Sequence, residues 1–286
     1  MNILARYASL VRFAHTIFAL PFALIGYVSA LVLCDIAFDG WTLVKILLCM
    51  VFARNAAMGF NRLVDRDIDA ENPRTASREI PSGAITPKQA AWFVAVNAVG
   101  FLVTAALINR MTFFLSPVAL FIILSYSYMK RSSAWTHIVL GVSLAMAPAG
   151  AYIAVTASLG IAPLILAGVV ITWVAGFDII YSMQDAEFDR AHGLHSIPAR
   201  FSNGKALAIS LLLHLVSIYA ILIFGIYYDL GNWYWIGAGL FIALLLTEHI
   251  LVTPRRQRCI GIAFGIFNGV ASAIYAVFTI TALLLR

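Results

Sequence analysis

The sequence predicts an all-α integral membrane protein with about nine transmembrane helices. Of its 286 residues, 62% are hydrophobic and only 11% are charged, whereas a soluble domain carries roughly 25% charged residues. The mean hydropathy is +0.93. Apolar runs of about 20 residues, the length that crosses a bilayer, recur along the whole chain. Because these runs are continuous and do not alternate with polar residues, they favour helices over the strands of a membrane barrel.

The apolar runs define the expected spans and a single domain covering residues 1–286. The spans are expected near residues 15–34, 41–60, 89–108, 112–129, 135–156, 161–181, 206–227, 232–252 and 259–284. Residues 1–14 carry Arg6 and Arg12 ahead of the first run. No separate cleavable signal peptide is expected there, because the run is too long for a signal and lacks a small-residue cleavage site.

The placement of the basic residues predicts the orientation in the membrane. The N-terminus and the even-numbered turns hold 15 of the 19 Lys and Arg, and the opposite side has only Arg110 and Arg286. By the positive-inside rule, the N-terminus is cytoplasmic and the C-terminus lies outside the cell inner membrane. The net charge of +6 therefore reflects topology and suits an anionic substrate. The partners expected are membrane lipid and small molecules, with no indication of nucleic acid.

Nine of the 13 acidic residues lie in two short segments, both on the predicted cytoplasmic side. The first segment contains Asp65, Asp67, Asp69, Glu71 and Glu79, and the second contains Asp178, Asp185, Glu187 and Asp189. A membrane protein without a charged ligand has no need to gather its acids in this way. The clustering indicates a site for a divalent cation.

Helical spacing selects which acids share a face. If the second span continues as a helix, Asn61, Asp65 and Asp69 lie about 6 Å apart along one face. Asp185 and Asp189 have the same spacing after the sixth span. Mg²⁺ binds carboxylates together with phosphate oxygens, so two such faces opposite each other would hold Mg²⁺ and a diphosphate. The alternative is that these are solvated helix ends, which is the interpretation for the acids off these faces, Asp67, Glu71 and Glu187.

Basic residues lie at two places on the same predicted side of the membrane as the acid segments. Arg74 and Arg78 follow the first segment, and Lys130 and Arg131 follow the fourth span. Guanidinium groups bind phosphate oxygens through paired donors, and lysine acts as a point charge. The positive-inside rule alone also places cations on this side, so both explanations stay open. Thr86-Pro87-Lys-Gln89 reads as a capping box that begins the third span and ends a cytoplasmic cap at residues 70–85.

Two charged residues lie deeper in the membrane. Arg54 precedes Asn61 by seven residues and Asp178 precedes Asp185 by seven, which places each roughly 10 Å further in on the same helix face. Ionisable residues inside a membrane usually face a cavity or a partner. Arg54 and Asp178 either pair with each other or line the floor of a cavity that binds a polar head group.

These motifs together resemble the UbiA-type intramembrane prenyltransferase family. The first is Arg54-x6-Asn61-x3-Asp65-x3-Asp69 with the following Asn72-Pro-Arg74-Thr-Ala-Ser-Arg78. The others are Tyr126-x3-Lys130-Arg131 and Asp178-Ile-Ile-Tyr181-x3-Asp185-x3-Asp189. One departure is Arg62, where many members have Asp directly after the Asn.

The resemblance implies a fold and an activity. The fold would be nine helices around a central chamber, capped on the cytoplasmic side by loops at about 61–88 and 182–205. The activity would be Mg²⁺-dependent transfer of a polyprenyl chain from an allylic diphosphate to a small aromatic acceptor. Metal ligands would be Asn61, Asp65, Asp69, Asp185 and Asp189, and diphosphate donors Arg74, Arg78, Lys130 and Arg131.

The remaining matched residues would serve the acceptor and the allylic cation. Asp178 would orient the acceptor hydroxyl or take a proton, and Arg54 would bind an acceptor carboxylate. Tyr126 and Tyr181 would stabilise the cation through their ring faces, although aromatic residues in spans are usually packing residues. The chain has six histidines, His15, His137, His192, His195, His214 and His249; they form no metal-ligand pattern, and His192 and His195 read as loop structure.

Within the family, Phe177-Asp178-Ile-Ile-Tyr181 and the later His195-Ser-Ile-Pro198-Ala-Arg200 resemble 4-hydroxybenzoate-type polyprenyltransferases. That subgroup implies respiratory quinone biosynthesis, of ubiquinone with 4-hydroxybenzoate or of menaquinone with a dihydroxynaphthoate. Prenylation of a lipid ether, haem or chlorophyll is the alternative within the family. A secondary transporter with intramembrane acids is the alternative of another class, and a structural or assembly protein is a third.

Overall fold

The computed structural model describes Tyr7, Leu10, residues 18–253 and residues 258–286. The predictions for Arg6, Arg12 and His15 lie outside these residues. Every regular element in the described part of the chain is helical. The long helices are α2 (Leu20–Leu33), α3 (Gly40–Val64), α5 (Pro87–Ala106), α6 (Arg110–Ser132), α7 (Thr136–Thr156), α8 (Ile161–Ser182), α11 (Asn203–Tyr227), α12 (Asn232–Leu251) and α14 (Asn268–Leu284).

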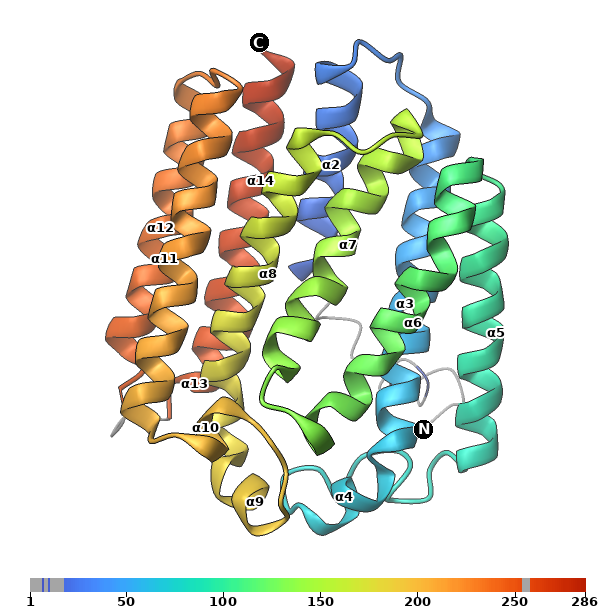
Figure 1. The fold of residues 1–286 in the computed structure, drawn as a ribbon, viewed down its shortest axis with the longest axis vertical. Helices are drawn as coiled ribbons and strands as arrows, with labels where there is room; N and C mark the ends of the chain where they lie inside the picture. The colour runs from blue at the N-terminus through green and yellow to red at the C-terminus, as the bar shows by residue number, and fades with distance from the viewer. Residues whose placement is uncertain (1–6, 8–9, 11–17, 254–257) are drawn as a thin grey trace. The chain divides into compact units, whose positions relative to one another are not determined.

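The short elements lie in the predicted caps and at the start of the last predicted span. They are α4 (Arg66–Glu71), the 3-10 turn η2 (Met183–Asp185), α9 (Ala186–Ala191), α10 (Ile197–Arg200), α13 (Ile260–Ile262) and the π-helical turn η3 (Ala263–Phe267). Figure 1 shows their order along the chain.

The predicted spans agree with the helices to within a few residues. Within the described residues, eight helices are long and apolar enough to cross a membrane, by length and composition. The first predicted span, 15–34, is described only from residue 18, and α2 has 14 residues. The last span is not one regular α-helix, because α13, η3 and α14 follow one another from Ile260 to Leu284. The prediction of an all-α multi-pass membrane protein is confirmed.

The described helices form two compact units. The first contains α3, α4, α5 and α6 up to Tyr128. In it α3 lies beside α5 (Figure 1), and the two are joined by polar contacts within an apolar surface. Asn55 Nδ2 donates to Asn97 Oδ1 at 2.9 Å, and Lys45 Nζ donates to the carbonyl of Leu107 at 3.1 Å. A hydrogen bond between spans satisfies groups that lipid cannot solvate.

The segment between α4 and α5 is held by a defined helix start and by apolar packing. Thr86 and Gln89 form the predicted capping box: Gln89 N–H donates to Thr86 Oγ1 at 3.2 Å, and Thr86 N–H donates to Gln89 Oε1 at 2.9 Å. Ile80 and Ile85 are buried in a cluster with Ala90. The cap segment is therefore anchored at both the start of α5 and its own apolar side chains.

The second unit contains residues 17–39 and 129–286, and α8 packs within it against α7 and α11. Figure 1 also shows α12 beside α14, with α2 adjacent to α7. Glycine permits close approaches between these helices. A Cβ on Gly141 of α7 would lie 2.4 Å from the carbonyl oxygen of Ile171 in α8. Small residues at such contacts let membrane helices pack backbone against backbone.

The core of the second unit combines aromatic rings with a buried polar chain. Trp173 packs edge-on against Phe177 and Phe241. Its indole Nε1 donates to Asn268 Oδ1 at 2.7 Å, and Asn268 Nδ2 donates to Glu248 Oε2 at 3.2 Å. All three polar side chains are almost fully buried. Their hydrogen bonds link α8, α12 and α14 and satisfy polar groups that are buried in the core.

Candidate functional site

The first acid segment lies where α3 ends and α4 begins. The helix does not run on unbroken as the spacing argument assumed, because Asp65 separates α3 from α4. One-turn spacing nevertheless persists: Asp65 N–H donates to the Asn61 carbonyl at 2.9 Å and Asp69 N–H to the Asp65 carbonyl at 2.7 Å. Asn61 Nδ2 also donates to Asp65 Oδ2 at 3.0 Å. Asn61 and Asp65 are thus neighbours, as predicted.

Asp69 is nearly buried and is held by arginine. Asp69 is 6% exposed. Arg78 Nη1 donates to both carboxylate oxygens, at 2.6 and 2.7 Å. Arg62 is also buried, and its Nη1 lies 3.9 Å from Asp69 Oδ2. A carboxylate removed from water needs such compensation by opposite charge and hydrogen bonds.

The residues that flank Asp69 differ in exposure. Asp67 and Glu71 are exposed, as expected for acids off the shared face, and so is Glu187 of the second segment. Arg74 is exposed, and its backbone N–H donates to Asn72 Oδ1 at 2.9 Å. Of the two arginines of this segment that were predicted to bind diphosphate, Arg78 therefore contacts an acid, and Arg74 has its side chain at the surface.

The second acid segment, like the first, has one aspartate directly before a short helix and another within that helix. Asp185 ends the 3-10 turn η2 and stands directly before α9. Asp189 lies in α9 and has no exposed surface, while Asp185 is 7% exposed. Both predicted ligands of this segment therefore have carboxylates largely withdrawn from solvent.

Asp189 is bound by two residues from elsewhere in the second unit. Lys130 Nζ lies 2.7 Å from its Oδ1, and Ser196 Oγ donates to its Oδ2 at 3.0 Å. The backbone N–H of His195 donates to the Lys130 carbonyl at 2.7 Å. The end of α6 and the segment after α9 thus hold this aspartate together.

Asp178 lies near the end of α8 and is partly buried. Its Oδ2 is 2.7 Å from Nδ1 of His137, a buried residue at the start of α7. Arg54 belongs to the first unit and is half-buried in α3. A pair between Arg54 and Asp178, or a shared cavity floor, stays a prediction.

The other predicted contact residues are placed as follows. Tyr126 is half-buried and Arg131 is exposed, both in α6. Tyr181 is half-buried near the end of α8, with its ring centroid 4.2 Å from that of Phe264. Tyr128 packs edge-on against Phe60 at 5.8 Å. These contacts make Tyr181 and Tyr128 part of local aromatic packing.

The donor set of the two acid segments suits Mg²⁺. In the part of the chain that the structure describes, no three His, Cys, Asp or Glu side chains form a ready-made metal cluster. The predicted ligands are instead shared between the segments, and all offer hard oxygen atoms, which Mg²⁺ prefers. Each oxygen of a carboxylate can accept more than one partner. Asp189, with Lys130 on one oxygen and Ser196 on the other, therefore retains lone pairs for a metal.

Three residues that contact the site were not predicted for these roles. They are Arg62 beside Asp69, Ser196 on Asp189 and His137 on Asp178. Arg62 was noted only as a departure from the family pattern, and His137 only as one of six histidines. A histidine at the start of an apolar helix was the available signal for His137, because an ionisable group there needs a partner.

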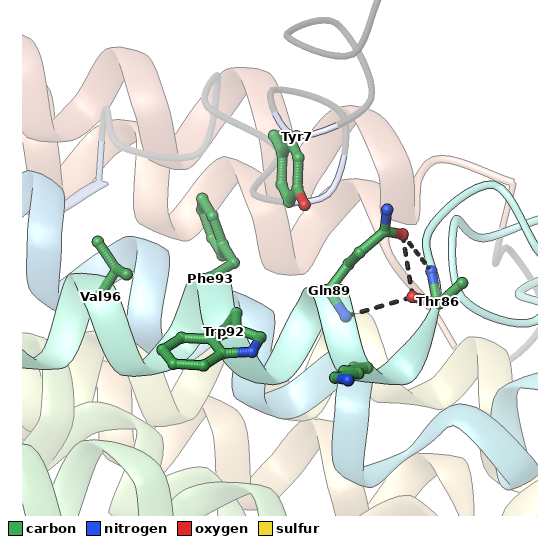
Figure 2. Close-up of a pocket in the computed structure, with 7 residues that line it drawn as sticks. Tyr7, Thr86, Gln89, Trp92, Phe93 and Val96 are labelled. Carbon is green, nitrogen blue, oxygen red and sulfur yellow. Dashed lines mark hydrogen bonds between the residues drawn. The ribbon is translucent and has the colours of Figure 1, made fainter.

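One surface pocket of the first unit lies apart from the acids. Figure 2 shows it between Tyr7 and α5, where Trp92, Phe93 and Val96 line it beside the capping box of Thr86 and Gln89. It encloses about 430 Å³ and is lined by no carboxylate. It lacks the chemistry of the predicted diphosphate site.

Comparison with known proteins identifies the family. The model of the UbiA prenyltransferase family matches residues 19–270. The chain belongs to the UbiA prenyltransferase family. The predicted enzyme class, a membrane prenyltransferase, is confirmed. Family membership also decides against the transporter and the assembly protein that the sequence left open.

Individual members of the family are similar over most of the chain. The 4-hydroxybenzoate octaprenyltransferase of Sodalis glossinidius is 33% identical, over 76% of this chain and 75% of that protein. The 4-hydroxybenzoate octaprenyltransferase of Nitrosospira multiformis is 30% identical, over 79% of this chain and 78% of its own length.

Solved structures of the family share the fold. The apo UbiA homolog from Aeropyrum pernix K1 is 30% identical, with a TM-score of 0.80 over 95% of this chain and 97% of that one. The UbiA homolog from Archaeoglobus fulgidus bound to GPP and Mg²⁺ has a TM-score of 0.72 at 22% identity, over 94% of this chain and 99% of that one.

Proposed function

We propose that this chain transfers a polyprenyl chain from an allylic diphosphate to a 4-hydroxybenzoate-like or dihydroxynaphthoate-like acceptor in respiratory quinone biosynthesis. The names of its relatives from Sodalis and Nitrosospira support an aromatic acceptor. The Archaeoglobus homologs bound to GPP or DMAPP with Mg²⁺ support the donor class and the metal. The observation that carries the proposal is that Asp69 and Asp189, one in each acid segment, are nearly buried and paired with a basic residue of a predicted motif.

The oxygen donors of both segments would hold the metal; they are Asn61, Asp65, Asp69, Asp185 and Asp189. Bound Mg²⁺ supplies Lewis-acid stabilisation of the charge that builds on the departing diphosphate. The pairing of Asn61 with Asp65 pre-positions an amide oxygen and a carboxylate on neighbouring turns. This arrangement limits the reorganisation that binding requires.

Arg78 and Lys130 have two roles in the proposal. Without substrate they compensate Asp69 and Asp189. With Mg²⁺ and diphosphate bound, Asp69 and Asp189 would be metal ligands, and the two basic side chains would donate to phosphate oxygens. Arg74 and Arg131, which are exposed, add donors from the cap. The basic side chains thus have an anionic partner both without and with substrate.

The reaction breaks the bond between C1 of the prenyl chain and the diphosphate oxygen, and the electron pair leaves with pyrophosphate. A ring carbon of the acceptor then bonds to C1, and the proton on that carbon passes to the Asp178 carboxylate or to the released pyrophosphate. Tyr126 and Tyr181 would stabilise the allylic cation through their ring faces. Asp178 would accept a hydrogen bond from the acceptor hydroxyl, and Arg54 would bind its carboxylate.

The same proposal covers organisation and location. Residues 1–286 would act as one functional domain, because both acid segments serve one reaction. The protein would lie in the cell inner membrane with its N-terminus in the cytoplasm, where water-soluble acceptors and Mg²⁺ are available. The distribution of Lys and Arg among the turns supports this orientation.

An assay with purified protein tests the acceptor class. The protein is incubated with Mg²⁺, one long-chain prenyl diphosphate, and either 4-hydroxybenzoate or a dihydroxynaphthoate, and prenylated products are separated by chromatography. The proposal predicts product with at least one aromatic acceptor. Product only with a lipid glycerol acceptor, or with haem or chlorophyll precursors, would overturn the aromatic assignment while leaving the family assignment intact.

A further inference from the structure

His137 occupies a position between two parts of the second unit that the proposed reaction uses. It is the second residue of α7 and is 1% exposed. Its Nδ1 lies 2.7 Å from Asp178 Oδ2, and its Nε2 lies 3.2 Å from the backbone nitrogen of Ile197. Both nitrogens of the ring therefore have a partner, one on α8 and one at the start of α10.

The Ile197 contact determines the tautomer of His137. A backbone N–H can only donate, so Nε2 must accept and carries no proton. The ring proton then lies on Nδ1, which donates to the Asp178 carboxylate. In a histidine, the hydrogen bond at one ring nitrogen decides which nitrogen carries the proton. His137 is thus a neutral donor to an anionic acid, and its ring cannot rotate without breaking both bonds.

Ile197 is directly joined to the environment of Asp189. Ser196 is fully buried, and its hydroxyl donates to Asp189 Oδ2 at 3.0 Å while accepting from the Ala199 N–H at 3.2 Å. The same turn therefore binds His137 through its backbone and Asp189 through its side chain. A continuous series of contacts runs from Asp178 through His137 and this turn to Asp189.

We infer that His137 is a positioning residue with two separable roles: its Nδ1 orients the Asp178 carboxylate, and its Nε2 holds the 196–199 turn beside Asp189. The inference rests on the proposed function, in which Asp178 meets the acceptor and Asp189 the metal. Through Nδ1, His137 fixes one oxygen of Asp178, and the other oxygen is directed to the acceptor hydroxyl. Residues that orient a functional carboxylate in this way strongly affect activity without touching substrate.

Two amide substitutions separate the two bonds of His137. The side-chain nitrogen of Asn occupies the place of Nδ1, so His137→Asn keeps the donor to Asp178 and loses the acceptor for Ile197. The side-chain oxygen of Gln reaches the place of Nε2, so His137→Gln keeps the Ile197 contact and loses the Asp178 contact. His137→Leu removes both. His214→Asn is the control, because His214 is equally buried but contacts His249 and the Trp173 carbonyl.

Steady-state KM values should differ between the variants according to which hydrogen bond of His137 each one loses. Loss of a hydrogen bond to a charged group corresponds to about tenfold or more in an equilibrium constant. We expect KM for the aromatic acceptor to rise about tenfold or more in His137→Gln and His137→Leu, with His137→Asn close to wild type. KM for the prenyl diphosphate should stay unchanged in His137→Gln. The His214→Asn control should leave both KM values unchanged.

Hydrogen exchange of the Ile197 amide is a readout that needs no activity. Protection should fall in His137→Asn and His137→Leu and remain in His137→Gln. Equal effects of the three substitutions on acceptor KM, or Ile197 protection that survives in His137→Leu, would overturn the inference. A wild-type protein that transfers no prenyl chain would overturn the proposed function instead, and the exchange pattern would still decide whether His137 holds the turn.

Discussion

At the residue scale, burial distinguishes two ion pairs of the first acid segment. Arg78 and Asp69 are close, with side chains 18% and 8% exposed. Arg66 Nη2 lies 3.3 Å from Asp67 Oδ2, but these side chains are 43% and 79% exposed. A pair withdrawn from water is costly to break, because the remaining charge keeps its desolvation penalty. An exposed pair contributes at most about 1 kcal/mol.

Arg78→Ala is therefore expected to destabilise the cap segment by roughly 2 kcal/mol, since Asp69 would keep only the more distant Arg62. The measurement is limited proteolysis between residues 70 and 85 together with thermal unfolding in detergent. Arg66→Ala is the matched control and should leave both unchanged. Equal protease sensitivity of the two variants would contradict the role of Arg78 at Asp69.

Residue types and spacing predicted much of the site but not its partners. Asn61, Asp65 and Asp69 follow one another by turns as the spacing indicated. The spacing could not show that Arg78 binds Asp69, because this contact depends on how the cap folds back over nine residues. His137 and Asp178 are 41 residues apart, and only the packing of α7 on α8 brings them together.

At the element scale, close helix packing in the second unit depends on glycine at defined positions. Gly141 and Gly150 both lie in α7. A Cβ at Gly141 would meet the backbone of Ile171 in α8, whereas a Cβ at Gly150 would meet nothing within 4 Å. Only the first glycine is required by the neighbouring helix. The backbone of a packed helix cannot move aside as a flexible side chain can.

Gly141→Ala is expected to destabilise the protein by about 1–3 kcal/mol, through overpacking between α7 and α8. Gly150→Ala should be neutral or slightly stabilising, because alanine favours helix more than glycine does. Thermal unfolding of both variants in the same detergent compares them directly. If Gly150→Ala lowers the melting temperature as much as Gly141→Ala, the close contact is not the cause.

Helix positions were predictable from the sequence because lipid requires every spanning backbone to be hydrogen-bonded internally. Hydropathy thus located the long helices, and Thr86 with Gln89 marked one helix start. The break at Asp65 and the π-helical turn at Ala263–Phe267 were missed. Both fall inside patterns that a regular helix also fits, and local packing decides between the two.

At the scale of the whole molecule, exposed side chains agree with a membrane environment. Large apolar residues such as Phe114 and Phe121 are exposed on α6. Exposed tryptophans lie at helix starts, among them Trp41 in α3 and Trp135 directly before α7. Tryptophan at helix ends is typical of the membrane interface. The orientation predicted from the distribution of Lys and Arg places the acid segments in the cytoplasm.

Cysteine labelling tests that orientation. Cys34, Cys49 and Cys259 are first replaced by alanine, and a single cysteine is then placed at an exposed serine, as Ser82→Cys or Ser158→Cys. In intact cells, a membrane-impermeant reagent should label the residue 158 variant at once and the residue 82 variant only after lysis. The reverse pattern would place the acid segments outside the cytoplasm.

The central claim is that both acid segments hold Mg²⁺ for diphosphate departure. Pyrophosphate release from a long-chain prenyl diphosphate with an aromatic acceptor tests it most directly, measured with Mg²⁺ or with a chelator. Asp65→Ala and Asp185→Ala alter one segment each, and Asp67→Ala removes an exposed acid as the control. We predict Mg²⁺-dependent release in the wild type and control, and a loss of about 100-fold or more in the other two variants. Folded Asp65→Ala or Asp185→Ala protein with the wild-type rate, or undiminished release in chelator, would contradict the account.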